Sequence, residues 1–109
     1  MKRKLIAKVF VFIFLIFSGK VFAEEQKASV WFTNPKENTV WLKLRIMDVD
    51  GNIMGESGII RPGEYVKDIS LTGEISDKIP IVLKVMSYEP ETYYSEGAVS
   101  LNTNIKPLS

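Results

Sequence analysis

Side chains that perform acid–base or nucleophilic chemistry are scarce in this 109-residue chain, which contains neither histidine nor cysteine. The usual general base, thiol nucleophile and transition-metal ligands are therefore missing, and a Ser-His-Asp arrangement cannot be built. Paired carboxylates remain, Glu89 with Glu91 and Asp48 with Asp50. Glycoside hydrolysis needs such a pair beside a cleft for a sugar ring, which a domain this small seldom provides. We expect no catalytic residue and no cofactor.

The acidic segment that begins at Asp48 invites comparison with calcium-binding loops. Asp48 and Asp50 place carboxylates at alternate positions before Gly51, which suits a hard cation. The EF-hand pattern fails, however, because loop position 12 holds Ile59 and not glutamate. A tight hairpin, in which glycine supplies a positive φ, explains the same residues. We therefore expect a turn and no metal.

An aromatic and acidic segment, residues 88–97, is the best candidate for a functional surface. It is long for a connection between two strands, and tyrosine is enriched where proteins bind one another or sugars. Trp41 joins the candidates because it lies on the face of its strand opposite Leu42. The alternative is that some of these rings cap the end of the domain. The candidate binding residues are Tyr88, Glu89, Glu91, Tyr93, Tyr94 and Trp41.

Apolar residues that alternate with polar ones predict the strands that would position this surface. The period of two is clearest in residues 39–47, 79–88 and 98–105, and shorter candidates are 28–33, 53–57 and 65–71. Turn residues separate these segments at intervals typical of an all-β domain. We predict an antiparallel β-sandwich, immunoglobulin-like, with six or seven strands. The expected core residues include Leu42, Leu44, Leu83, Val85, Val99 and Leu101.

The first 23 residues have the pattern of a secretory signal. Basic residues 2–4 and Lys8 precede an uninterrupted apolar run at 9–17, and Val21-Phe22-Ala23 ends the segment. A membrane anchor is the alternative, but a spanning helix needs about 20 apolar residues. We expect an N-terminal signal helix in residues 1–23, cleavage after Ala23, and one mature domain at 24–109 that is secreted or associated with the cell envelope.

Cleavage would change the charge of the protein. Five of the 14 basic residues lie in the signal, so nine basic and 13 acidic residues remain and the net charge becomes −4. A surface without basic clusters disfavours nucleic acid and anionic membranes as partners. The absence of cysteine excludes disulfides and a lipid anchor on cysteine.

The turn motifs carry a resemblance to small exported β-sandwich proteins, mostly of Gram-positive bacteria. The motifs are Asn34-Pro35, Asn38, residues 48–51, Ser57-Gly58, Pro62-Gly63 and residues 88–94. This resemblance implies the fold and the exported location, and no activity. Asn34-Pro35 and Arg61-Pro62 are also similar to two loops of chagasin-like inhibitors of cysteine proteases. Lys36-Glu37-Asn38 departs from the Thr-Thr-Gly of that family, and the chain lacks its glycine-rich middle loop.

These features leave two classes of function open. The first is a non-catalytic binding module that contacts another exported protein or an envelope glycan through loops at one end of the sandwich. The second is an inhibitor or immunity-type protein that blocks an exported enzyme with the same loops. Clustered exposed aromatic residues would favour binding of either kind, whereas converging carboxylates in a groove would favour catalysis.

Overall fold

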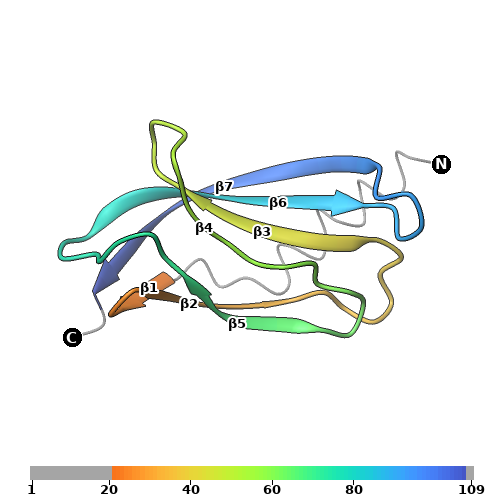
Figure 1. Cartoon of the computed structure of the whole chain (residues 1–109), viewed down its shortest axis with the longest axis horizontal. Helices are drawn as coiled ribbons and strands as arrows, with labels where there is room; N and C mark the ends of the chain where they lie inside the picture. The colour runs from red at the N-terminus through yellow and green to blue at the C-terminus, as the bar shows by residue number, and fades with distance from the viewer. Residues whose placement is uncertain (1–20, 108–109) are drawn as a thin grey trace.

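Seven strands make up most of residues 21–107, the part of the chain that the computed structural model describes (Figure 1). The bounds of six strands lie within three residues of the predicted segments at each end, which confirms these six predictions. No helix occurs in the described residues. The strands are β1 (Val21–Glu24), β2 (Lys27–Thr33), β3 (Trp41–Met47), β4 (Ile53–Glu56), β5 (Tyr65–Ser70), β6 (Ile79–Tyr88) and β7 (Ser95–Pro107).

All seven strands belong to one mixed sheet with the order β4-β3-β6-β7-β1-β2-β5. The prediction of a purely antiparallel sheet is wrong at one place, because β1 runs parallel to β7. Strand β1 itself was not expected, since its residues match the end of a signal segment. The remainder of the predicted signal, residues 1–20, lies outside the described residues.

The sheet rolls until its two outer strands almost meet, so the fold is nearly a barrel. The backbone N–H of Thr72, just after β5, donates to the carbonyl of Met54 in β4 over 2.9 Å. A Cβ atom at Gly55 would lie 2.5 Å from the carbonyl oxygen of Ser70. Only glycine permits such a close approach of β4 to β5.

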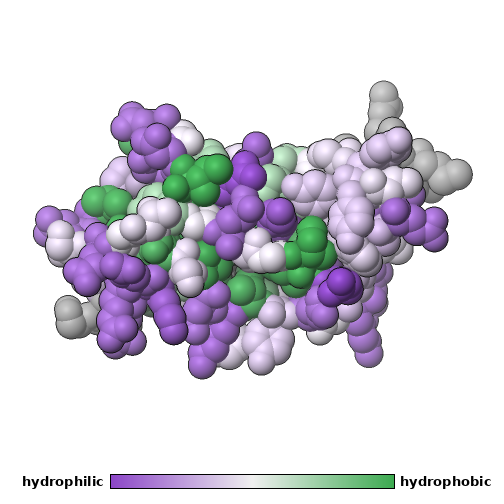
Figure 2. Space-filling view, in the orientation of Figure 1, coloured by the Kyte–Doolittle hydropathy of each residue, from purple (hydrophilic) through white to green (hydrophobic). Residues whose placement is uncertain are grey.

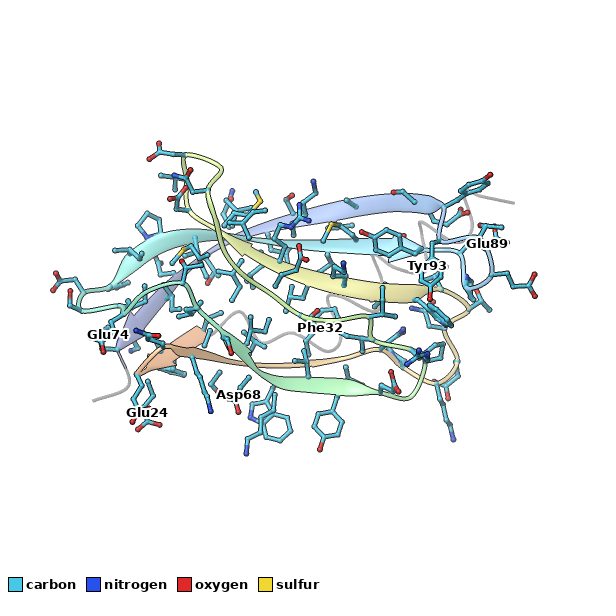
Figure 3. The ribbon with its side chains drawn as sticks, viewed as in Figure 1. Glu24, Phe32, Asp68, Glu74, Glu89 and Tyr93 are labelled. Carbon is cyan, nitrogen blue, oxygen red and sulfur yellow. The ribbon has the colours of Figure 1, made fainter. Side chains whose placement is uncertain are left out.

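Along each strand the side chains alternate in direction, and those that point inward fill the interior of the roll. Phe32, labelled in Figure 3, points from β2 into this interior and is almost fully buried. Five of the six predicted core residues are buried, namely Leu42, Leu44, Leu83, Val85 and Val99. Leu101 is only partly buried, which corrects the prediction. Among the described residues, β1 lies beside β7 only from Ile105 onward, so Leu101 falls at a less covered part of β7.

The two ends of the roll carry different connections (Figure 1). The β2–β3 loop, the segment between β4 and β5, and the β6–β7 loop gather at one end. The β3–β4 turn and the β5–β6 connection lie at the other. The candidate binding surface and the acidic turn at Asp48 are therefore at opposite ends of the domain.

Candidate binding surface

The end formed by the three gathered loops carries a cluster of aromatic and cationic side chains, which we call the end surface: Trp41, Arg61, Tyr93 and Tyr94. The rings of Trp41 and Tyr93 meet edge to face with their centroids 5.4 Å apart. The guanidinium of Arg61 lies over the Trp41 ring, 4.9 Å from its centroid. Among residues 21–107, Tyr94 is the most exposed of the large hydrophobic side chains, at 70%. The surface thus combines residues from β3 and two loops.

The β6–β7 connection is shorter than predicted. The sequence suggested ten residues, 88–97, but β6 continues to Tyr88 and β7 begins at Ser95, so the loop is residues 89–94. Between the pairs Ser87–Gly97 and Tyr88–Ser95, β7 holds one extra residue, Glu96. The bulge interrupts the alternation of inward and outward side chains, so the start of β7 was not recognised in the sequence.

Backbone hydrogen bonds hold the β6–β7 loop in a defined shape. The N–H of Glu89 donates to the carbonyl of Tyr94, and the N–H of Tyr93 donates to the carbonyl of Glu89, both over 2.9 Å. Tyr93 has a φ of 61°, a left-handed conformation that a tyrosine rarely adopts. Figure 3 shows Tyr93 and Glu89 at the end of the molecule, away from the core. The loop presents Tyr93 in a preformed position.

The structure brings only some of the predicted site residues together. Tyr93, Tyr94 and Trp41 belong to the end surface, while Glu91 is exposed and Glu89 half-buried on the same loop. Tyr88 is half-buried in β6, and its hydroxyl donates to the Met86 sulfur over 3.5 Å. Trp41 is half-buried, with the Arg61 guanidinium over its ring and Tyr93 against its edge.

A buried asparagine ties two of these loops together. Nδ2 of Asn34 donates to the carbonyls of Val40 and Ile60, over 2.9 and 2.8 Å. Its Oδ1 accepts a hydrogen bond of 2.9 Å from Nδ2 of Asn38. Gly63 N–H donates to the Asn34 carbonyl over 2.7 Å. The Asn-Pro motif was predicted as a turn, and the structure shows in addition that its Asn34 side chain is fully buried and used within the fold.

A second aromatic pair, on the outer face of β2 and β5, was missed as a site. Trp31 and Tyr65 stack with their ring planes 10° apart and their centroids separated by 5.9 Å. They are 57% and 63% exposed, and Nζ of Lys67 lies 5.3 Å from the Trp31 centroid. Trp31 occupies a bulge of β2 and has a φ of 47°. The available signal was the alternation of β2, which places Trp31 outward between buried Val30 and Phe32.

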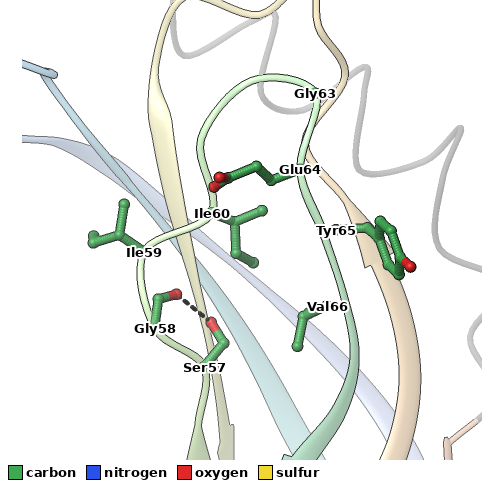
Figure 4. Close-up of a pocket in the computed structure, with 8 residues that line it drawn as sticks. All are labelled: Ser57, Gly58, Ile59, Ile60, Gly63, Glu64, Tyr65 and Val66. Atoms are coloured by element: carbon green, nitrogen blue, oxygen red, sulfur yellow. Dashed lines mark hydrogen bonds between the residues drawn. The ribbon is translucent and has the colours of Figure 1, made fainter.

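An open depression of about 500 Å³ lies between the segment after β4 and the start of β5 (Figure 4). Its lining includes Ser57, Ile59, Ile60, Glu64, Tyr65 and Val66. Oε1 of Glu64 accepts a hydrogen bond of 2.7 Å from the backbone N–H of Arg61. The depression offers polar and apolar contacts in similar measure. It marks the place where the rolled sheet does not close.

Asp48, which the sequence also offered as a candidate carboxylate, serves local structure. Asp48 accepts hydrogen bonds from the Asn52 side chain and from the backbone N–H groups of Asn52 and Asp50, each 2.9 Å long. These bonds, the Asn52 side chain first, hold the pKa of Asp48 below its usual value. The predicted hairpin turn is thus confirmed. Among residues 21–107, no three His, Cys, Asp or Glu side chains are grouped as a metal site requires.

The outer surface varies in polarity along the molecule. In Figure 2, residues of intermediate hydropathy cover much of the end that carries the β6–β7 loop, whereas strongly hydrophilic residues dominate the lower part of the opposite end. Amphipathic aromatic side chains with a polar tip have such intermediate hydropathy and are suited to contacts that form and dissociate in water. In the described part of the chain there is no helix of the length and apolarity needed to cross a membrane.

Comparison with models of known protein families finds no match for this chain, and comparison with curated proteins finds none either.

Proposed function

We propose that this chain is an exported, non-catalytic binding module of the cell envelope or the secreted fraction, which contacts a protein or a glycan through the end surface. The observation that carries the proposal is the packed cluster of Trp41, Tyr93 and Arg61. Tryptophan, tyrosine and arginine are the residues most enriched in binding hot spots. Their mutual contacts and the hydrogen-bonded loop reduce the entropy that would be lost on binding.

Export is supported by the order of basic residues, apolar run and Val21-Phe22-Ala23 in the first 23 residues. We further propose that the mature domain is an immunoglobulin-like sandwich. Removal of β1 from the sheet order would leave β4-β3-β6-β7 as one sheet and β2-β5 as another. Two such sheets around one core are the arrangement of that fold class.

A non-catalytic role is supported by the absence of histidine and cysteine from the sequence. The Asp48 carboxylate is also unavailable for glycoside hydrolysis, because it is engaged with the turn that it closes.

The alternative function, inhibition of an exported enzyme, is favoured by one observation. The hydrogen bond from the Gly63 N–H to the Asn34 carbonyl joins the loops with Asn34-Pro35 and Arg61-Pro62, and both loops lie at the same end as the β6–β7 loop (Figure 1). Such a composite edge could enter an enzyme cleft. The buried Asn34 side chain could not contribute to that contact. Activity assays of proteases from the producing cells, with and without the domain, would detect inhibition.

The experiment that tests the binding proposal compares retention of the exported domain on two probes, purified cell-wall glycan and the immobilised secreted protein fraction of the producing cells. The double variant Tyr93→Ala with Tyr94→Ala should lose at least about fivefold in affinity, or about 1 kcal/mol, with little change in Tm. Val49→Ala changes an exposed apolar side chain in the β3–β4 turn, at the opposite end of the domain, and should bind normally. Equal binding by the wild type and the double variant would contradict the proposal, as would unfolding of the double variant.

A further inference from the structure

Strand β1 crosses the position at which the signal is predicted to be cut. Cleavage after Ala23 would remove Val21, Phe22 and Ala23 and leave only Glu24 of this strand. Val21 and Ala23 are 2% and 4% exposed, so both belong to the core. The strand also pairs on both sides, antiparallel to β2 and parallel to β7. The residues predicted to leave therefore fill a central position in the sheet.

Their removal would open a slot between β2 and β7. Neighbouring strands lie about 4.8 Å apart, so the two strands would be separated by about 10 Å, with backbone donors and acceptors facing the gap from each side. Ala28 in β2 and Ile105 in β7 are both completely buried and are register partners of β1 residues. Without β1, both would lose part of their cover.

We propose that in the mature protein this slot accepts an extended segment of another exported protein, which takes the place of β1. The inference rests on the export and cleavage proposed above. An inserted strand would satisfy the backbone groups of both β2 and β7 at once, as in known cases of β-strand addition.

The residues of β1 define the chemistry of the segment that fits. The two inward positions need small or medium apolar side chains, because Ala23 is paired with Ala28 and Val21 with Ile105. The outward position between them suits an aromatic ring, since Nζ of Lys106 lies 5.3 Å from the centroid of Phe22. The expected segment is therefore apolar, aromatic, apolar in sequence and extended in shape.

The turn that joins β1 to β2 supports an occupant from outside the mature chain. A two-residue hairpin favours glycine, asparagine or aspartate, but here the turn residues are Glu25 and Gln26. Glu25 has a φ of 56°, which glutamate rarely adopts. A separate segment in the slot would not require this turn, because after cleavage residues 24–26 would no longer connect β1 to β2.

A second copy of the mature chain is a poor donor. Its first residues, 24–26, are polar and cannot fill the two apolar positions. The other strands among the described residues are already paired in the sheet. A strand that is already paired in one sheet has at most one free edge, whereas the occupant of the slot must pair along both of its edges, with β2 and with β7. An extended segment of a different protein meets this requirement.

The test begins with the N-terminus of the exported protein, determined by mass spectrometry and expected at Glu24. The probe is a synthetic peptide with blocked ends and the sequence of residues 19–24. At saturation it should raise the Tm of the exported protein by at least about 5 °C and slow amide exchange in β2 and at the end of β7. An exported protein that folds only when the peptide is added would also support the inference.

Two controls make the result specific to the slot. A peptide with Val21→Lys and Ala23→Lys should have no effect, because charged groups cannot occupy the buried positions. A chain that begins at Val21 carries its own β1, so the peptide should change neither its Tm nor its amide exchange. An exported protein that retains Val21 would overturn both the predicted cleavage and the inference. One that begins at Glu24 but gains neither stability nor protection, or that closes the slot by dimerisation, would overturn the inference alone.

Discussion

The substitution Asn34→Ala should destabilise the domain more than its small change in volume suggests. The side chain is completely buried and makes three hydrogen bonds of 2.8–2.9 Å. Alanine would leave the carbonyls of Val40 and Ile60 and one N–H of Asn38 without these partners. Each such buried group costs about 1–3 kcal/mol, and partial entry of water would limit the sum to about 3–5 kcal/mol. This is a large share of the stability of a typical small domain.

Urea denaturation, followed by far-UV circular dichroism, would measure this loss. Asn104→Ala, at an exposed position of β7, is the matched control and should change the free energy of unfolding by less than about 0.5 kcal/mol. Asn38→Ala should fall between the two, because its amide makes one hydrogen bond to Asn34. A loss below about 1 kcal/mol for Asn34→Ala, with an unchanged m-value, would refute the view that this residue holds the two loops together.

Other substitutions test the core, the sheet closure, the acidic turn and the bulge. Leu44→Ala should cost about 2–5 kcal/mol in the same assay, since this leucine is almost fully buried; a loss under 1 kcal/mol would show that its cavity collapses. Gly55→Ala should lower Tm markedly, because the new Cβ would lie 2.5 Å from a β5 carbonyl oxygen, whereas Gly73→Ala, with nothing within 4 Å, should not; equal effects would contradict the close approach. Asp48 has a lowered pKa, so its contribution is present above the pKa of the unfolded chain and is lost as the pH falls through the folded one. Asp48→Asn should therefore reduce the fall in stability below about pH 4, and an unchanged pH profile would exclude this role. Trp31→Gly should be more stable than Trp31→Ala by about 0.5–1 kcal/mol, the reverse of the usual order in strands, because its φ is positive; the usual order would argue against strain there.

The sequence predicted the strands best where one face alone meets the core. In β3 the burial alternates without interruption, and the neighbouring strand β6 has the predicted bounds. The start of β7 was missed because Glu96 forms a bulge that breaks the period of two. Strand β1 was missed for a different reason: one short stretch satisfies both a cleavage pattern and a strand, and local composition does not distinguish them.

The candidate site was predictable in its residue types but not in its contacts. Tyr93 and Trp41 were both candidate binding residues, yet their edge-to-face contact depends on the pairing of β3 with β6. The role of Asn34 depends on Ile60, 26 residues further along the chain. The stacking of Trp31 on Tyr65 likewise requires the pairing of β2 with β5. Such long-range partners leave no local signal in a single sequence.

Backbone strain links the three surfaces discussed above. Among the described residues, the non-glycine residues with positive φ are Glu25, Trp31 and Tyr93. Each is exposed, so burial of its side chain does not offset the cost of about 1–3 kcal/mol that such a conformation carries. Strain of this kind persists where the surrounding structure fixes the backbone, and it is concentrated at binding sites and switches. Trp31 and Tyr93 therefore mark two aromatic surfaces that are held in place before any partner arrives. Glu25 lies in the β1–β2 turn, and cleavage after Ala23 would release the strain of this turn. The strain at Trp31 and Tyr93 would stay, so the slot would open during maturation whereas the two aromatic surfaces are already formed in the fold.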